Sequence, residues 1–520
     1  MRNARKVHVV AALVAAFCAW LLVSAGGAAA AQGKIAWAKC HGGPFQCGTL
    51  QVPLDYDHPN GRTVGLGLTR LPATDPEHRI GSLVINPGGP GGPGAAYIVE
   101  TGQDLFTPEV RARYDLVGFD PRGVNSSAAL RCFGNDRQWE PFFTPFAFPM
   151  NTDELDQWIV ADHFLDGACA RRGGAIAEHM STANVARDMD RLRAALGDAR
   201  LHYSGVSYGS FLGNTYANMF PDRVGRLVID GVLDPVAWTT GVGDEAQTIP
   251  FSTREHSDAG AWATLQEFFR LCDAGGDRCA FSGGAEDRFA QLADDLLAAP
   301  KVVPFPDGSE GELNYSNLVG ITLGFLGYSP DWPELAQLLA DFESAPASKR
   351  VRVALRRYSS RSSGWVSHRS FPRYFNALEG GPAVFCTDSD NPDSYDSWFD
   401  AGVAADATAP YFGRLWTWVS GICADWPFAD SDRYTGPWDH ATANPVLVVG
   451  NQFDPATRYE NAQTVAATLP GARLLTLHAW AHTSGFLSSC ADEAIARYLL
   501  DGTLPAVGTV CEQDEVPFAQ

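Results

Sequence analysis

Short apolar runs of the strand type recur along the chain, and each one ends in turn residues. These runs are GSLVINPGG (81–89), YDLVGFDPRG (114–123), LHYSG (201–205) and RLVIDGVLDP (226–235). Before the third run the spacing changes to one apolar residue every three or four positions, at Val185, Met189, Leu192 and Leu196. This period predicts an amphipathic helix over 181–197 that ends at Gly197. Strands that alternate with helices predict a mostly parallel sheet with helices on both faces.

The alternation stops at about residue 236 and resumes at NPVLVVGNQFD (444–454), which a helix-like segment and the strand-like ARLLTLHAWAH (472–482) follow. The interrupted stretch is rich in aromatic residues and contains segments with helical spacing, such as AWATLQEFFRLC. We therefore expect one α/β domain split by an inserted, mainly helical cap. The core would comprise 32–235 and 441–520, and the cap 236–440. A separate C-terminal domain is the alternative, but the region after 440 is too short for a sheet of its own.

The N-terminus has the pattern of an export signal. Arg2, Arg5 and Lys6 precede the apolar run VVAALVAAFCAWLLVSA, and the small residues GGAAAA follow it. This order predicts a signal peptide over 1–31, cleaved near Ala30 or Ala31, and hence a secreted protein. An uncleaved membrane anchor is the alternative, because the run is long enough to span a bilayer. The small residues at its end favour cleavage.

The cysteines agree with export. One of the eleven, Cys18, lies in the predicted signal peptide, and an even number in the exported part predicts disulfides. The remaining ten fall into neighbouring pairs, so we expect the bonds 40–47, 132–169, 272–279, 386–423 and 490–511. No Cys-x-x-Cys or histidine-rich pattern indicates a metal, and no cofactor is expected.

The composition restricts the partners. Hydrophobic residues make up 45% and charged residues 19%, which is typical of a globular protein. The formal net charge of −21 argues against nucleic acid and against an anionic membrane surface, because both require a basic face. We therefore expect neither nucleic-acid binding nor stable membrane association. The sequence does not indicate an oligomeric state.

The first candidate for chemistry is Ser207. Gly205, Ser207 and Gly209 spell G-x-S-x-G within LHYSGVSYGSFLG (201–213), a weak signal in a chain with 52 glycines. The context strengthens it, because a strand-like run precedes the serine and the helix-like YGSFLGNTYANMF follows. A nucleophilic serine on a sharp strand-to-helix turn needs glycine on both sides, since the backbone is strained and neighbouring strands approach closely. The pattern predicts Ser207 as a nucleophile.

A serine nucleophile needs a base and an acid, and in this fold they follow it in the order Ser, Asp, His. His482 follows a predicted strand in the small-residue loop HTSG, whereas His478 belongs within that strand and is expected to be structural. Asp454 ends the preceding strand and is the expected acid. Asp234, after RLVIDGVLDP, is the alternative acid, and Asp230 is expected to belong to the strand end and its packing.

Two backbone N–H groups must stabilise the developing oxyanion. The residue after the nucleophile, Tyr208, supplies one. The loop NPGGPGGPG (86–94), directly after a strand, would supply the other, and Gly89 is the choice because Pro90 has no N–H, with Gly88 as the alternative. The loop does not fit a phosphate-binding loop, because it lacks the Lys and Ser/Thr of that motif.

The motifs NPGGPGG, GFDPRGVNS, GVSYGS, GNQFDPAT and AHTSG occur in this order. In these motifs and their order, the chain resembles the secreted tripeptidyl aminopeptidases over roughly residues 35 to 515. These are serine exopeptidases of the α/β-hydrolase fold, related to the prolyl aminopeptidases. The resemblance implies that Ser207, Asp454 and His482 form the triad, and that Asp120 and Arg122 are mainly structural. The sequence departs from related patterns at Ala481 and Asn125, and neither departure removes a catalytic group.

The resemblance implies a serine hydrolase that acts on peptides with a free N-terminus and releases short peptides, tripeptides by analogy. A carboxylesterase or lipase would use the same triad, and a non-catalytic binding protein on this scaffold is a third hypothesis. An exopeptidase needs groups that bind the free α-amine. Asp244, Glu245 and Glu255, early in the cap, are candidates among which the sequence does not choose.

Overall fold

The computed structural model describes residues 34–304, 310–344, 349–358 and 376–519. The predicted signal peptide (1–31) lies outside the described residues. Within the described part, no helix is both long enough and apolar enough to cross a membrane.

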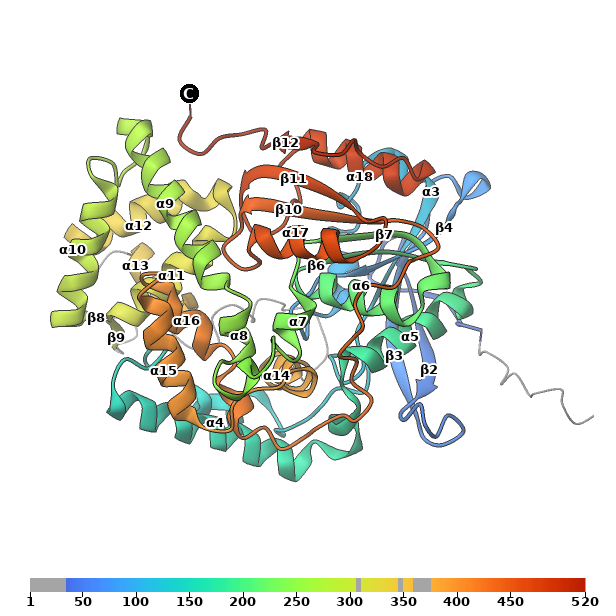
Figure 1. The fold of residues 1–520 in the computed structure, drawn as a ribbon, viewed down its shortest axis with the longest axis horizontal. Coiled ribbons are helices and arrows are strands. Elements are labelled where there is room, and N and C mark those ends of the chain that lie inside the picture. Colours follow the sequence, from blue (N-terminus) through green and yellow to red (C-terminus); the bar gives the residue numbers. More distant parts are fainter. Residues whose placement is uncertain (1–33, 305–309, 345–348, 359–375, 520) are drawn as a thin grey trace, which may run out of the picture. The chain divides into compact units, whose positions relative to one another are not determined.

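A ten-stranded sheet organises the chain (Figure 1). Its order is β1-β2-β3-β5-β4-β6-β7-β10-β11-β12. The bounds are β1 (Ala38–Lys39), β2 (Gln46–Pro53), β3 (Thr63–Leu71), β4 (Gly81–Asn86), β5 (Tyr114–Phe119), β6 (Leu201–Val206), β7 (Val224–Asp230), β10 (Val446–Phe453), β11 (Arg473–Trp480) and β12 (Val510–Glu512). The strands from β5 to β12 in this order pair in parallel, whereas β1, β2 and β3 add an antiparallel edge. The six predicted strands are therefore confirmed as the centre of a mostly parallel sheet.

Both faces of the sheet are buried, because central strands such as β4, β5, β7 and β10 place residues in two different hydrophobic clusters. In β4, for example, Val84 belongs to one cluster, and Leu83 and Ile85 belong to the other. The first cluster includes α5 (Thr182–Leu196), α6 (Tyr208–Met219) and α17 (Tyr459–Thr468). The second includes α2 (Gly94–Thr101), α3 (Pro108–Arg113) and α18 (Ser489–Asp501). This arrangement is the α/β-hydrolase fold that the sequence predicts.

The helix predicted over 181–197 is α5. The Ser181 hydroxyl accepts the N–H of Asn184 at its start, and Gly197 ends it in the left-handed conformation with φ of 85°. Glycine suits this position because it has no Cβ to oppose a positive φ. The apolar residues that predict this helix, from Val185 to Leu192, are fully buried in the cluster that α5 shares with α6.

The chain between β7 and β10 is mainly helical. Its elements are α7 (Pro235–Trp238), α8 (Phe251–Arg254), α9 (Ser257–Gly275), α10 (Ala285–Ala298), the hairpin β8 (Lys301–Pro304) and β9 (Glu310–Leu313), α11 (Tyr315–Leu326), α12 (Trp332–Ser344), α13 (Lys349–Tyr358), α14 (Ala377–Asp388), α15 (Tyr395–Asp406) and α16 (Phe412–Trp418). Most of these helices share a third hydrophobic cluster. Trp158 belongs to the same cluster and packs edge-on against Trp418, although it comes from α4 (Thr152–Arg172), a helix that precedes α5. The domain boundaries themselves stay predictions.

All five predicted disulfide pairs are bonded. They join Cys40 to Cys47, Cys132 to Cys169, Cys272 to Cys279, Cys386 to Cys423 and Cys490 to Cys511. Each of the ten cysteines in the described residues is therefore linked to its neighbour in the sequence.

Candidate active site

Ser207 occupies the turn between β6 and α6. Its backbone has φ of 57° and ψ of −129°, a conformation that costs a non-glycine residue on the order of 1–3 kcal/mol. Two backbone bonds hold the turn, because Ser207 N–H donates to Asp230 O (2.9 Å) and Ser207 O accepts the N–H of Ser210 (2.7 Å). The serine is half-buried at the carboxyl edge of the sheet. This is the geometry of a nucleophile elbow.

The two glycines of G-x-S-x-G are required by close backbone approach. A Cβ on Gly205 would lie 2.4 Å from Gly209 O, and a Cβ on Gly209 would lie 2.8 Å from Asn86 O. Neither distance leaves room for a side chain. The motif is therefore explained by packing of the turn against its own helix and against the end of β4.

Asp454 and His482 form a hydrogen-bonded pair. Asp454 follows β10 and is fully buried, and His482 Nδ1 lies 3.0 Å from its Oδ1 and 3.1 Å from its Oδ2. The N–H groups of Ala456 and Thr457 donate to Oδ1, each at 2.8 Å, and the Thr457 hydroxyl donates to Oδ2, also at 2.8 Å. Burial raises the pKa of Asp454, but His482 and these donors outweigh it and hold the pKa below its ordinary value.

The pKa of His482 is raised. Burial alone lowers it, but the charge of Asp454, its hydrogen bond and the charge of Asp230 outweigh burial. The imidazole lies beside the end of β7, since its Cε1 is 3.4 Å from the position that a Cβ on Gly231 would take. Ser207 contacts the same strand end through Asp230 O. The structure therefore brings the three predicted residues to one edge of the sheet.

The inserted region holds the backbone of His482. His482 N–H donates to Gly327 O (2.9 Å), and Tyr328 forms an isolated β-bridge with Ala481. Gly327 and Tyr328 come directly after α11. The loop that carries the imidazole is thus attached to the insertion as well as to the sheet.

The loop after β4 lies against the elbow. A Cβ on Gly88 would lie 2.8 Å from Ser207 Cβ and 3.2 Å from Tyr208 N. Gly88 N–H donates to Asn86 Oδ1 (2.9 Å), whereas Gly89 N–H has no acceptor among the described residues. Tyr208 is the first residue of α6, where a backbone N–H has no partner within the helix. Among the described residues, the N–H groups of the predicted pair, Tyr208 and Gly89, therefore have no acceptor.

The alternatives from the sequence have other partners. Asp234 accepts the N–H groups of Val236 and Ala237 and caps α7. His478 is bonded to Glu512 near the surface. Asp230, expected to belong to the strand end and its packing, also binds the loop that carries His482.

Asp230 is buried, and its Oδ2 accepts both the N–H (2.9 Å) and the hydroxyl (2.7 Å) of Ser484, two residues after His482. Burial, partly opposed by these bonds, raises the pKa of Asp230 to about 6. One residue therefore holds the serine through its carbonyl and the histidine loop through its carboxylate. The sequence signal for this role of Asp230 was an acidic residue at the end of a predicted strand.

Asp120 and Arg122 of the DPRG motif are buried and fully engaged. Asp120 accepts Ala95 N–H (3.0 Å), which ties the first turn of α2 to the end of β5, and it also accepts Asn125 Nδ2 (3.0 Å). Arg122 forms a bidentate ion pair with Asp188 of α5. Both side chains order the loops behind the elbow.

The candidate amine anchors differ in exposure. Asp244 and Glu245 are exposed, and Glu245 accepts the N–H of Val242. Glu255 is buried, and its Oε2 accepts Asp234 N–H (3.1 Å) and Asn461 Nδ2 (2.8 Å). Burial raises the pKa of Glu255 well above its ordinary value, which favours the neutral acid. Glu255 therefore links the insertion to the core and is a poor counter-ion for an ammonium group.

A group of metal-ligating type consists of Asp55, Asp57 and Asp432, whose carboxylate atoms lie within 4.8 Å of one another. Asp55 already bonds His58 and the N–H of Asp57. Another group, Cys40, His41 and Cys47, contains a disulfide, so its sulfur atoms are bonded to each other.

A parallel sheet with a strained serine elbow and an Asp–His pair at its carboxyl edge defines the class of serine hydrolases with the α/β-hydrolase fold. The family model described as "alpha/beta hydrolase fold" matches residues 81–268, and the one described as "TAP-like protein" matches 409–511. The chain is 31% identical to a tripeptidyl aminopeptidase of Streptomyces lividans, over 94% of this chain and 89% of that protein. The chain belongs to the tripeptidyl aminopeptidase family of serine peptidases.

Other relatives carry different names. The chain is 33% identical to "Serine protease Hip1" of Mycobacterium tuberculosis, over 89% of this chain and 87% of that protein. It is 32% identical to "Carboxylesterase B" of the same organism, over 90% of this chain and 86% of that protein. The second match matters for substrate class, because peptide and ester hydrolysis can both use a triad of Ser, Asp and His.

Proposed function

We propose that the protein is a secreted serine exopeptidase that releases short peptides, tripeptides by analogy, from free N-termini through an acyl-enzyme on Ser207. The observation that carries this proposal is the Asp454–His482 pair beside the strained Ser207 elbow. The similarity to tripeptidyl aminopeptidases over nearly the whole chain supports the peptide substrate. The five disulfides support an oxidising, extracellular destination after cleavage of the segment 1–31.

In the proposed mechanism His482 Nε2 accepts the Ser207 hydroxyl proton while Ser207 Oγ attacks the carbonyl carbon of the scissile bond. The N–H groups of Tyr208 and Gly89 donate to the oxyanion. His482 then gives the proton to the leaving amine, and water hydrolyses the acyl-enzyme. Asp454 accepts the Nδ1 proton, which keeps Nε2 free to act as the base, and it stabilises the imidazolium that forms.

We assign substrate selection to the insertion (236–440). Its turn after α11 is bonded to the backbone of His482, so the insertion borders the site directly. This placement suits a cap that limits the length of chain on the amine side of the scissile bond. Among the proposed amine anchors, only Asp244 and Glu245 are exposed.

A fluorophosphonate probe tests the nucleophile. Wild type should be labelled, Ser207→Ala should not, and Ser204→Ala, three residues earlier on β6, should be labelled like wild type. Labelling of Ser207→Ala, or of neither wild type nor variant, would contradict the assignment and favour a non-catalytic protein.

Carboxylester hydrolysis is the second candidate, because a relative of similar identity is named a carboxylesterase. A pair of tetrapeptide substrates with a free and an acetylated N-terminus separates the two. Exopeptidase action requires cleavage of the free peptide alone. Equal cleavage of both excludes an exopeptidase, and cleavage of esters only supports the esterase. A panel of aminoacyl, dipeptidyl and tripeptidyl chromogenic substrates, with and without Pro at the cleaved position, then measures the length released.

A further inference from the structure

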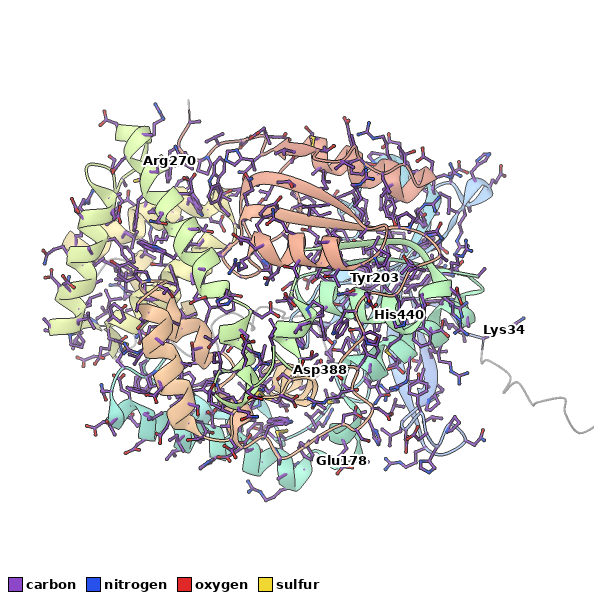
Figure 2. The ribbon with its side chains drawn as sticks, in the orientation of Figure 1. Lys34, Glu178, Tyr203, Arg270, Asp388 and His440 are labelled. Atoms are coloured by element: carbon purple, nitrogen blue, oxygen red, sulfur yellow. A yellow bond between two sulfur atoms is a disulfide. The ribbon has the colours of Figure 1, made fainter. Side chains whose placement is uncertain are left out.

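Helix α14 belongs to the insertion, yet its C-terminal residue reaches the elbow. Asp388, labelled in Figure 2, is buried at this end of α14. Its Oδ1 accepts Thr182 N–H (2.8 Å) and its Oδ2 accepts the Thr182 hydroxyl (2.6 Å). The Thr182 Oγ1 is also 2.5 Å from the hydroxyl of Tyr208. A chain of hydrogen bonds therefore runs from the insertion to the residue that follows the nucleophile.

The donor and acceptor in each of these hydrogen bonds follow from the number of hydroxyl protons. Thr182 has one hydroxyl proton, which it donates to the ionised Asp388 carboxylate. The Tyr208 hydroxyl must therefore donate to Thr182 Oγ1. Such a connected set of bonds holds the Tyr208 ring at its far end while the α6 backbone holds it at the near end.

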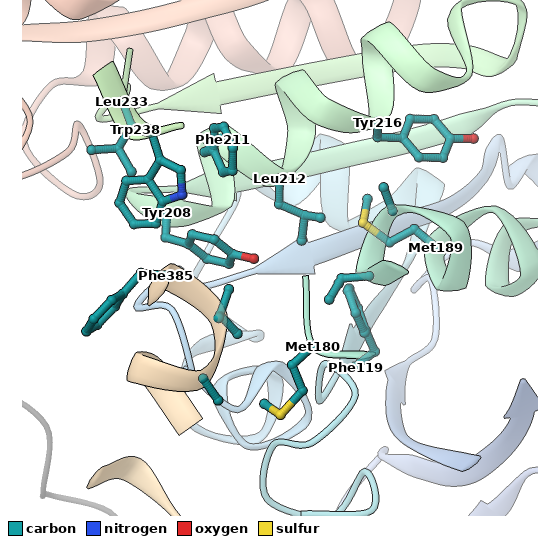
Figure 3. Close-up of a cluster of buried hydrophobic side chains, with 14 of the residues drawn as sticks. Phe119, Met180, Met189, Tyr208, Phe211, Leu212, Tyr216, Leu233, Trp238 and Phe385 are labelled. Carbon is teal, nitrogen blue, oxygen red and sulfur yellow. The ribbon is translucent and has the colours of Figure 1, made fainter. Parts of the chain in front are cut away.

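Aromatic packing restrains the same ring. Tyr208 lies 5.8 Å from Trp238 and 6.3 Å from Phe211, measured between ring centroids. Figure 3 shows these rings together with Phe385 of α14, which stands one residue before Cys386. The Cys386–Cys423 disulfide ties this end of α14 to the chain after α16.

The middle of α14 packs on the other half of the proposed oxyanion site. A Cβ on Gly91 would lie 2.9 Å from Gly381 N, and a Cβ on Gly381 would lie 3.2 Å from Pro90 O. The helix backbone thus rests directly on the two residues after Gly89. At its N-cap, Asn376 accepts Asn125 N–H (2.9 Å) and donates to Gly123 O (2.6 Å).

We propose that α14 positions both oxyanion donors, and that Asp388 is a positioning residue that acts through Thr182 on Tyr208. The inference rests on the proposed function, since it assumes that the N–H groups of Tyr208 and Gly89 receive the oxyanion. Oxyanion donors act only when they lie within a few tenths of an ångström of the correct place, and hydrogen bonds behind them secure that place. Asp388 itself touches no reacting atom.

The experiment measures kcat and KM separately in four variants: Asp388→Asn, Thr182→Val, Tyr208→Phe and Thr182→Ser. The first three break the chain of bonds and should lower kcat about tenfold or more, while KM changes by less than about threefold, because the loss concerns the transition state. Thr182→Ser keeps the hydroxyl and should restore kcat to near the wild-type value. The double variant Asp388→Asn/Tyr208→Phe should be no worse than the poorer single variant, because the bonds act as one unit.

Asp430→Asn is the matched control. The Asp430 carboxylate is also buried and also binds the start of α5, through Ser181 N–H and Asn184 Nδ2, but it has no bond to Thr182 or Tyr208. An equal loss of kcat in this control and in the test variants, or unchanged kcat in Thr182→Val and Tyr208→Phe, overturns the inference. These two variants decide the question if Asp388→Asn fails to fold.

Fluorophosphonate labelling separates this failure from failure of the proposed function. If wild type is labelled at Ser207 and the test variants keep wild-type kcat, only the positioning role of α14 is wrong. If wild type is not labelled, the nucleophile assignment is wrong, and the positioning role is wrong with it.

Discussion

Replacing Arg122 by methionine should strongly destabilise the protein. The guanidinium is fully buried, as is its partner Asp188, with Nε to Oδ2 at 2.7 Å and Nη2 to Oδ1 at 2.6 Å. It also donates to the carbonyl oxygens of Leu54 (2.8 Å), Pro53 (3.0 Å) and His179 (3.3 Å). Arg122→Met would leave the Asp188 carboxylate buried without its guanidinium, although it would still accept the Tyr56 hydroxyl (2.7 Å). The three carbonyl oxygens, two of them buried and that of His179 half-buried, would lose a donor.

Removing one partner of a buried ion pair costs about 3–5 kcal/mol, so we expect the free energy of unfolding to fall by about that amount. Urea denaturation followed by tryptophan fluorescence, with the disulfides intact, measures the change. Arg270→Met is the control, because the Arg270–Glu267 pair is exposed on the arginine side (58%) and should contribute about 1 kcal/mol or less. Arg122→Met/Asp188→Leu should be more stable than Arg122→Met alone, since it removes the unpaired charge. A loss below about 1 kcal/mol in Arg122→Met, or a double variant that is less stable still, would refute this reasoning.

Three further predictions concern the site and its support. Asp230→Asn removes a charge that raises the pKa of His482. Because the imidazole must be neutral to accept a proton, the acid limb of the pH profile of kcat/KM should move to lower pH. An acid limb that does not move, or that moves to higher pH, contradicts this prediction. Gly88→Ala places a Cβ 2.8 Å from Ser207 Cβ at a φ of +86°, and kcat should fall about 100-fold or more in steady-state assays, whereas near-normal turnover would show that the loop can shift. Replacing Cys386 and Cys423 by serine opens a loop of 37 residues, and the free energy of unfolding should drop by about 4 kcal/mol in urea, whereas no change in the denaturation midpoint would exclude a stabilising role.

Local periodicity was sufficient for the central fold. The apolar spacing from Val185 to Leu196 and the glycine after it describe a helix that needs no distant contact to be recognised, and α5 has those bounds within one residue. The antiparallel strands β2 and β3 were not predicted. Their burial alternates only in part, and glycines interrupt β3 at positions 65 and 67.

In the candidate site, too, the sequence predicts some residues and misses contacts between distant parts of the chain. Asp454 and His482 could be predicted because the fold imposes a chain order on strand ends, and their hydrogen bond agrees with that prediction. Their catalytic roles remain a proposal. The bond between Thr182 and Asp388 could not be predicted, because 206 residues separate them and no spacing rule relates a helix start to an inserted helix. The sequence chose Gly89 over Gly88 because of Pro90, whereas the structure distinguishes them by the bond from Gly88 N–H to Asn86 Oδ1, which no local pattern indicates.

The order in which the cysteines pair has a consequence for biogenesis. Every bond joins a cysteine to the next one along the chain, at separations of 7 to 37 residues. A chain that enters an oxidising compartment N-terminus first presents each partner before the following pair arrives. With Cys18 removed in the predicted signal peptide, an oxidant that joins cysteines strictly in order of arrival would therefore form all five native bonds, with no mispaired species for an isomerase to repair.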